Sequence, residues 1–260
     1  PGLLRGLLQQ AEEGEALTSP TSPQEPGERR QGGLSLRLRE FYASRPLTIS
    51  VEFFPPRTPE AEARLSAAIA EIKPLKPAFC SVTYGAGGST HDKTLDIVVR
   101  LKRDEGLEAM CHLTCIGQPR ARLREILETL KASGIENMIA LRGDPPAGET
   151  EWRPHPDGFR YSVELVREAA SLKWFSIAVA GFPETHPQAA SREADLAYLK
   201  AKVEAGADAV ITQLFFDTGD FFRFVEDARR IGIAVPIIPG ILPIKSVPQV
   251  RRFAAMCGAK

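Results

Sequence analysis

The sequence has few cysteines and no long apolar run. Four cysteines in 260 residues do not make the dense framework of a disulfide-stapled domain, which favours a reducing compartment. No apolar run reaches the roughly 18 to 20 residues of a membrane span. Glu12, Glu13 and Glu15 occupy the stretch where a signal peptide needs an apolar core. We therefore expect a cytoplasmic protein that does not cross a membrane.

The chain also lacks an excess of charge of either sign. Lys plus Arg amount to 33 and Asp plus Glu to 33, so the formal net charge is zero. Proteins that bind nucleic acid normally carry a basic excess, so we do not expect nucleic acid as a partner. The sequence contains no P-loop, no H-E-x-x-H and no G-x-S-x-G motif. Any function must therefore be inferred from the placement of individual polar side chains.

Residues 1–33 differ in composition from the rest of the chain. Residues 18–27 form a Pro/Ser/Thr/Gly tract without apolar periodicity. Such a tract cannot bury enough surface to offset its ordering entropy, so we expect residues 1–33 to be a disordered tail. Leu34, Leu38 and Phe41 then follow at helical spacing and predict a short helix that leads into a domain spanning 34–260.

From residue 47 onward, short apolar runs alternate with segments of helical periodicity. The expected strands lie near 48–54, 78–84, 107–115, 136–141, 174–181, 208–215 and 236–241. The expected helices lie near 59–73, 91–104, 119–132, 160–171, 190–205, 218–231 and 246–256. Gly106, Gly134, Gly206 and Gly232 each follow a helical stretch, as helix-ending glycines do. This alternation is typical of a parallel sheet built from βαβ units.

Seven such units favour an α/β fold of the (β/α)8 TIM-barrel type, with the eighth unit expected to be missing. The alternative is an open doubly wound sheet, which usually binds its cofactor at a glycine-rich first turn. The glycine-rich loop at 85–90 follows the second expected strand and has Thr90 where the third glycine of G-x-G-x-x-G belongs. The barrel is therefore the better interpretation.

Polar residues near the ends of the strands predict a site. In the first strand Val51 and Phe53 share an apolar face, so Glu52 should point into the barrel. The same alternation selects one polar position or pair near the end of each of four further strands: Thr83, His112, Arg142 with Asp144, and Gln213. On the fourth strand it places Met138 and Ala140 on the same inward face as Arg142. Because barrel active sites lie at the carboxyl ends of the strands, we expect these polar side chains to converge.

Cys111, His112 and Cys115 lie close together in the sequence but do not predict a metal site. Strand alternation places both cysteines on the face opposite His112, so the three cannot converge on one zinc ion. With no C-x-x-C pair elsewhere, we expect no metal.

Several segments together resemble one family, methylenetetrahydrofolate reductase. In chain order they are Val51-Glu52-Phe53-Phe54-Pro55-Pro56-Arg57, Ser81-Val82-Thr83-Tyr84-Gly85, His112-Leu113-Thr114-Cys115, Ala140-Leu141-Arg142-Gly143-Asp144-Pro145, His186-Pro187, Ile211-Thr212-Gln213-Leu214-Phe215-Phe216-Asp217 and Ile238-Pro239-Gly240-Ile241. The resemblance implies a (β/α)8 flavoprotein that binds FAD non-covalently. It implies that NADH or NADPH reduces the flavin and leaves, after which 5,10-methylenetetrahydrofolate accepts the hydride and becomes 5-methyltetrahydrofolate for methionine synthesis. It also implies a homo-oligomer.

The resemblance assigns roles to individual residues. It implies that Glu52 is the general acid and that Asp144 is the carboxylate beside flavin and folate. The implied flavin-site positions are Thr83, Tyr84, His112, Arg142, Gly143, Asp144, Tyr161, Ser162, Phe182, His186, Asp195 and Lys202. The implied substrate contacts are Glu52, Asp144, Gln213, Gln249 and Phe253.

The sequence departs from the family pattern at two places. Phe182 stands where members commonly have Tyr, so we expect it to be a packing contact only. An eighth strand that carries a substrate-binding Arg and Tyr cannot be placed. Two alternatives stay open: a flavin-free tetrahydrofolate-binding barrel such as a corrinoid-linked methyltransferase, and an inactive truncated copy.

Overall fold

A computed structural model describes residues 37–44, 47–84, 91–144 and 153–259 of the chain. The expected tail at 1–33 and the first residues of the expected lead-in helix lie outside the described residues. The glycine-rich loop at 85–90 also lies outside them.

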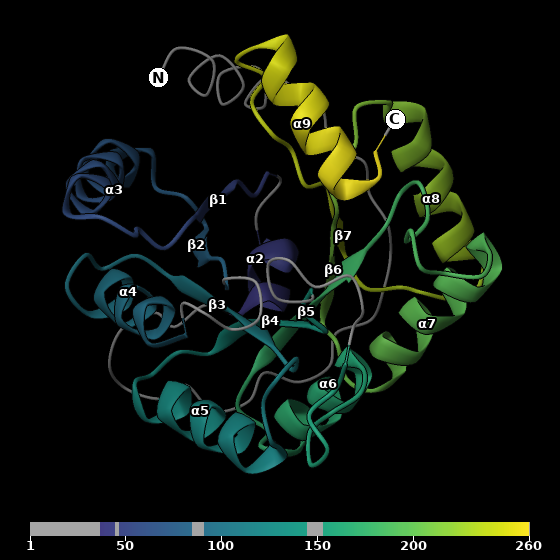
Figure 1. Ribbon diagram of the computed structural model, residues 1–260, viewed down its shortest axis with the longest axis horizontal. Coiled ribbons are helices and arrows are strands. Elements are labelled where there is room, and N and C mark those ends of the chain that lie inside the picture. Colours follow the sequence, from purple (N-terminus) through teal and green to yellow (C-terminus); the bar gives the residue numbers. More distant parts are fainter. Residues whose placement is uncertain (1–36, 45–46, 85–90, 145–152, 260) are drawn as a thin grey trace.

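The described chain forms a seven-stranded parallel sheet in the order β1-β2-β3-β4-β5-β6-β7, with helices around its outside (Figure 1). The strands are β1 Ser50–Phe53, β2 Phe79–Val82, β3 Ala109–Thr114, β4 Asn137–Leu141, β5 Ser176–Gly181, β6 Ala209–Thr212 and β7 Ile237–Ile238. The helices are α2 Leu38–Ser44, α3 Pro59–Ile72, η1 Lys73–Leu75, α4 His91–Arg103, α5 Arg120–Ala132, α6 Ser162–Ser171, α7 Arg192–Glu204, α8 Thr218–Arg230 and α9 Val247–Cys257. The predicted TIM-barrel class is confirmed: the sheet is a curled barrel wall with one helix after each strand.

Local sequence signals fix where the helices begin and end. The side chains of Thr58, Ser191, Asp217 and Ser246 accept hydrogen bonds from backbone N–H groups in the first turns of α3, α7, α8 and α9. The glycines predicted to end helices have positive φ angles, for example 75° at Gly134. The helix boundaries therefore follow from local capping residues that the sequence already shows.

The core has two parts, one on each face of the sheet. The outer part packs the helices against strand residues such as Cys80, Leu113 and Val179. The inner part fills the barrel with Phe79, Met110, Ile139, Ala178 and Ala209, and it is closed from one end by α2. Leu38 and Phe41 of α2 are 0% and 1% exposed, so α2 acts as a plug in the amino-terminal end of the barrel.

The structure confirms the predicted faces of four strands and corrects one. Phe53 lies in the outer core, and Met110 and Ile211 lie on the inner side, as alternation predicts. On β4 the prediction is wrong: Met138 and Ala140 pack outward, and Ile139 points into the barrel. Pairing agrees, because Ile139 is aligned with His112 of β3.

Within the described residues, β1 and β7 are each paired on one side only. Their side chains are more exposed than those of the central strands, in which β2 and β3 are buried throughout. Among the described residues, no helix is both long and apolar enough to span a bilayer.

Candidate active site

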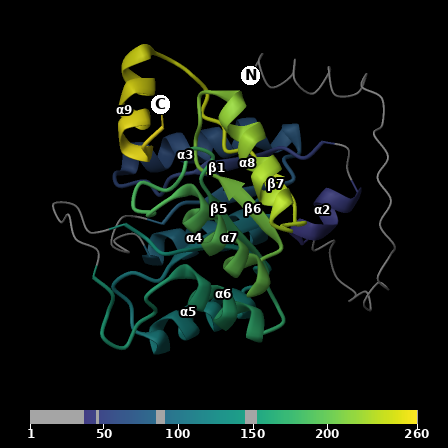
Figure 2. The same ribbon diagram turned by 90° about the vertical axis from the view of Figure 1, so that its right-hand side faces the viewer.

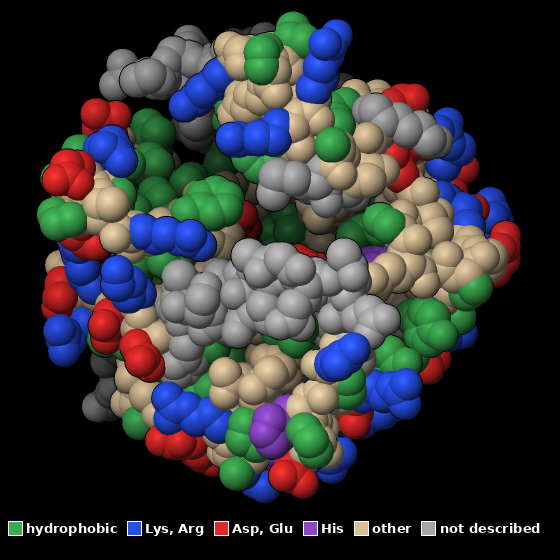
Figure 3. All heavy atoms as spheres, viewed as in Figure 1, with side chains coloured by type: hydrophobic (Ala, Val, Ile, Leu, Met, Phe, Trp, Pro, Cys, Tyr) green, Lys and Arg blue, Asp and Glu red, His purple; other side chains and the backbone are tan. Residues whose placement is uncertain are grey.

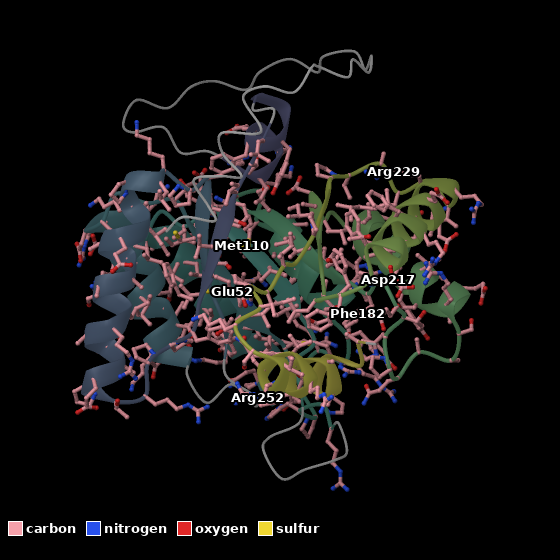
Figure 4. All side chains as sticks on the ribbon, turned by 90° about the horizontal axis from the view of Figure 1, so that it is seen from above. Glu52, Met110, Phe182, Asp217, Arg229 and Arg252 are labelled. Atoms are coloured by element: carbon pink, nitrogen blue, oxygen red, sulfur yellow. The ribbon has the colours of Figure 1, made fainter. Side chains whose placement is uncertain are left out.

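The open end of the barrel lies opposite the plug. Figure 2 shows α2 and α9 at opposite ends of the molecule, so α9 borders the end at which the strands terminate. Figure 3 looks onto that end and shows a hollow beside the side chains of α9. Figure 4 shows Met110, Glu52 and Arg252 in that order from the α2 end toward α9. We refer to this hollow at the carboxyl ends of the strands as the mouth.

A carboxyl–imidazole pair lies inside the mouth. Glu52 of β1 and His112 of β3 approach to 3.4 Å between Oε2 and Nε2. The His112 side chain is 10% exposed, and burial lowers its pKa to about 4, so the imidazole is neutral near pH 7. Burial also raises the pKa of Glu52, although its side chain is still 47% exposed. A molecule bound in the mouth would cover this carboxyl and raise its pKa further, so Glu52 can hold a proton.

A second polar group lies near the end of β5. The pKa of His186 is lowered by burial first, and then by the charge of Arg142; Asp195 and Asp144 oppose this shift, and Lys202 adds to it. These four charged side chains are therefore close enough to act on the His186 imidazole electrostatically. Together with His186 they come from the β4 end, the β5–α7 loop and α7, so the fold gathers the charges that the sequence analysis selected.

Lys202 and Asp195 of α7 lie on the inner side of the charged side chains around His186. The Lys202 ammonium donates to the Ala180 carbonyl at 2.6 Å, and burial lowers the pKa of Lys202 to about 8. Asp195 accepts from the His186 backbone N–H at 2.9 Å. Both residues stand on one face of α7, as their spacing of seven predicts. A partly desolvated ammonium of this kind attracts an anion, because pairing with an anion offsets the desolvation.

The β5–α7 loop orients His186. Phe182 packs against its ring edge to face, with centroids 4.5 Å apart, and its expected packing contact with the cofactor stays a prediction. The Gln188 backbone N–H donates to His186 Nδ1 at 3.0 Å, so the neutral ring carries its proton on Nε2. Arg192 donates to the Pro183 carbonyl and pairs with Asp227, which ties the loop to α7 and α8.

A glycine is required just after β4. Gly143 has φ +91°, and a Cβ there would clash with Ile116 Cγ2 and lie 3.0 Å from Thr114 Cβ, so the residues at the end of β3 pack directly against it. The buried Thr114 hydroxyl has no hydrogen-bond partner among the described residues. A buried hydroxyl of this kind normally finds a partner, so it is a candidate to bind a polar ligand atom. The orphaned hydroxyl and the Lys202 ammonium suit a cofactor with both polar and anionic parts, as FAD has.

Five further predicted positions lie at three places in the structure. Thr83 and Gln213 follow β2 and β6 at the mouth, and both are partly buried. Tyr161 and Ser162 begin α6, where Tyr161 is 51% exposed. Tyr84 is placed differently: its side chain packs in the outer core, and Asp92 and Arg122 influence its pKa. The structure therefore places the Tyr84 phenol away from the polar side chains of the mouth, because Tyr84 lies on the helix side of β2.

Gln249 and Phe253 share one half-buried face of α9. The Gln249 side chain accepts from the Lys245 backbone N–H at 3.0 Å, and Ser246 caps the same turn. Gln249 thus stabilises the start of α9, a local role that the S-x-x-Q spacing at 246–249 signals.

Sequence reasoning missed Thr114 as a site residue. Its place on the His112 face was visible from alternation, but the lack of a partner for its hydroxyl is a property of the folded chain. Of the residues that the structure describes, no three His, Cys, Asp or Glu side chains gather as metal ligands would.

Fold and site together define a (β/α)-barrel whose polar groups meet at the carboxyl ends of the strands, which is where barrel enzymes bind their substrates. A sequence model of methylenetetrahydrofolate reductase matches residues 37–260. The chain belongs to this family.

Named relatives show the same relationship. Methylenetetrahydrofolate reductase (NADH) 1 of Arabidopsis thaliana is 43% identical over 222 residues, which is 81% of this chain and 38% of the plant protein. The 5,10-methylenetetrahydrofolate reductase of Escherichia coli is 44% identical over 214 residues, covering 82% of this chain and 70% of the bacterial one. The chain thus spans less than half the length of the plant relative.

Solved structures support the fold. An uncharacterized protein from Clostridium thermocellum, described as binding two copies of 5-methyl-5,6,7,8-tetrahydrofolic acid, superposes with a TM-score of 0.60 at 14% identity. The alignment covers 86% of this chain and 76% of that one. Oxaloacetate acetylhydrolase superposes with a TM-score of 0.55 at 12% identity, covering 84% and 76%. At these identities the likeness concerns the barrel alone.

Proposed function

We propose that this chain carries the catalytic barrel for reduction of 5,10-methylenetetrahydrofolate to 5-methyltetrahydrofolate, with FAD as the hydride carrier and a reduced nicotinamide as the donor. The observation that carries the proposal is the Glu52–His112 pair in the mouth of the barrel. Family membership supports the reaction, and the names of the plant relatives support NADH as donor. The expected homo-oligomer, the cytoplasmic location and a link to methionine synthesis stay predictions from the sequence.

The residues at the β4 and β5 ends would hold the cofactor. When bound, FAD accepts a hydride from the nicotinamide and passes it to the folate. Lys202 offers an ammonium to an anionic part of the cofactor, and Arg142 adds a second positive charge nearby. The Thr114 hydroxyl would offer a hydrogen bond to a polar atom of the cofactor. Asp144 supplies a negative charge at the same place and would position the substrate.

Glu52 would supply the proton. The methylene bridge of the substrate opens when a ring nitrogen is protonated, which leaves an iminium carbon ready to accept hydride. A carboxyl can donate this proton near pH 7 only if its pKa is raised, and burial raises that of Glu52. The neutral imidazole of His112 beside it does not oppose the protonated form, as a cation would.

The Glu52→Gln variant tests this assignment. Gln keeps the shape but cannot donate the proton, so folate reduction should fall by about 10²- to 10⁴-fold. Reduction of bound flavin by NADH should change little, because that step needs no acid at Glu52. Stopped-flow absorbance of the two half-reactions, measured separately without oxygen, gives both rates.

Glu62→Gln is the matched control, because Glu62 lies outside the barrel in an ion pair with Arg100. It should leave both half-reactions unchanged. An equal loss of both half-reactions in Glu52→Gln would contradict the acid role. A wild-type protein that stays colourless after incubation with FAD would overturn the flavin reaction and favour a flavin-free folate-binding barrel.

A further inference from the structure

The last part of the chain carries only positive charge. Asp227 is the final acidic residue of the sequence. Residues 228–260 then contain six basic side chains: Arg229, Arg230, Lys245, Arg251, Arg252 and Lys260. Figure 4 places Arg229 toward the α2 end of the molecule and Arg252 on α9. Of this basic segment, therefore, only the part that includes α9, with Arg251 and Arg252, borders the mouth.

Two adjacent arginines of α9 occupy different sides of the helix. At about 100° per residue, Arg252 lies about 60° around the helix from Gln249, whereas Arg251 lies about 160° from both Gln249 and Phe253. The Arg252 guanidinium also lies 5.2 Å from the centre of the Phe253 ring. Arg252 therefore lies on the Gln249 side of the half-buried face of α9, and Arg251 lies on its opposite side, next to Ala254.

Neither arginine is neutralised locally. Both side chains are exposed, and within the described ranges no carboxylate forms an ion pair with either of them. Other arginines nearby are engaged: Arg230 pairs with Asp227, and Arg229 donates to the Ile233 and Val235 carbonyls. A guanidinium that has no partner is free to bind an external anion.

The position of α9 brings Arg252 to the substrate path. A Cβ added to Gly258, at the end of α9, would lie 2.9 Å from Pro187 Cγ, so the helix packs against the loop that carries His186. Figure 4 shows Arg252 on the outer side of Glu52 along the barrel axis. Inside the mouth, Arg142 and Lys202 lie with Asp144 and Asp195 around His186, so an anionic end that projects beyond this group meets its next basic side chains on α9.

We propose that Arg252 is a specificity-determining residue that binds the anionic end of a substrate projecting from the mouth. The inference rests on the proposed function, in which both reactants have such an end: the glutamyl carboxylates of the folate and the phosphates of the dinucleotide. A planar guanidinium suits either group, because it donates two parallel hydrogen bonds to carboxylate or phosphate oxygens. The ring of Phe253 lies beside the guanidinium and holds it at the rim of the mouth.

Arg252→Gln and Arg251→Gln form a matched pair of variants. Dissociation constants of the FAD-loaded protein are measured by calorimetry with ligands that cannot exchange a hydride with the flavin, so the readout does not depend on turnover. 5-Methyltetrahydrofolate with one and with three glutamyl residues is added to the reduced protein without oxygen, and NAD⁺ and NADP⁺ are added to the oxidised protein. Arg252→Gln should weaken binding of at least one ligand pair by about two- to fivefold at low salt, as expected for an exposed ion pair. The loss should shrink at high salt, and Arg251→Gln should bind like the wild type.

The ligand series identifies the anion. A loss that grows with the number of glutamyl carboxylates assigns Arg252 to the folate, and a loss that is larger for NADP⁺ than for NAD⁺ assigns it to the dinucleotide phosphates. Equal affinities in the two variants, with normal wild-type binding, overturn this inference alone. If the wild type binds neither folate nor dinucleotide, the proposed function fails and this inference fails with it.

Discussion

The imidazole of His112 is held neutral inside the barrel by its surroundings. Its side chain is 10% exposed, and its nearest ionisable partner is the Glu52 carboxyl at 3.4 Å. Because burial lowers its pKa from 6.5 to about 4, the folded chain binds this proton less readily than the unfolded chain does. The same burial that suits His112 to lie beside a protonated carboxyl therefore makes the fold sensitive to acid.

The acid sensitivity gives a test. Between pH 6.5 and pH 4 the unfolded chain takes up a proton at His112 that the folded chain does not, so the free energy of unfolding falls as the pH falls. Denaturant unfolding of wild type and His112→Asn over this range should differ in slope by up to about 1.4 kcal/mol per pH unit, with the variant less steep. Both measurements are repeated in the Glu52→Gln background. This substitution removes the titration of that carboxyl, whose effect on the pH dependence is opposite to that of His112. Parallel curves would show that His112 titrates normally in the fold.

At the scale of elements, the alternation of apolar and polar residues correctly predicted the inward and outward faces of four strands. It placed Glu52 and His112 inward, and the structure brings them together. On β4 it failed because the polar residues that guided it, Arg142 and Asp144, lie beyond the last strand residue. Gly143, with φ +91°, turns the backbone there. The side-chain directions after the strand therefore do not continue the alternation within it. Side chains past a strand end must be placed by loop geometry, which the sequence pattern does not encode.

The plug helix α2 is an element whose role depends on distant partners. Helical spacing predicted the helix, but not its insertion into the barrel. Phe41 stacks obliquely on Phe79, with ring centroids 6.1 Å apart. The Leu38 backbone N–H donates to Asn137 Oδ1 at 3.1 Å, and Asn137 in turn donates to Glu108. These contacts join α2 to β2 and β4, so the plug stabilises the end of the barrel opposite the mouth.

Phe41→Ala should therefore be severely destabilising. Removing a ring that is 1% exposed leaves a cavity between α2 and the inner core, with an expected loss of about 3–5 kcal/mol in the free energy of unfolding. Phe222→Ala is the matched control, because Phe222 of α8 is 63% exposed and its truncation should change stability by less than about 0.5 kcal/mol. Urea unfolding monitored by circular dichroism measures both. Similar small losses in the two variants would mean that α2 does not close the barrel.

At the scale of the whole molecule, the apolar inner core lies toward the α2 end of the barrel, and the site groups with shifted pKa values lie at the mouth. The α2 end is filled with side chains that are almost fully buried. The mouth contains Lys202 with a lowered pKa, His186 with a lowered pKa and an unpartnered Thr114 hydroxyl among the described residues. Such groups cost stability in the ligand-free chain and favour the bound state, so cofactor binding and global stability should be coupled.

That coupling predicts how FAD changes thermal stability. FAD at about 100 times its dissociation constant should stabilise the wild type by about 2.7 kcal/mol at pH 7. Lys202 has a pKa of about 8 in the free protein, and an anionic partner raises it, so binding above pH 8 requires uptake of a proton. The stabilisation by FAD should therefore be smaller at pH 9 than at pH 7, as measured by differential scanning calorimetry. Lys202→Met removes a partly desolvated charge, so this variant should melt no lower than wild type without FAD, gain less from FAD and lose the pH dependence. A variant that melts lower without FAD yet gains as much from it would assign Lys202 a structural role in place of cofactor binding.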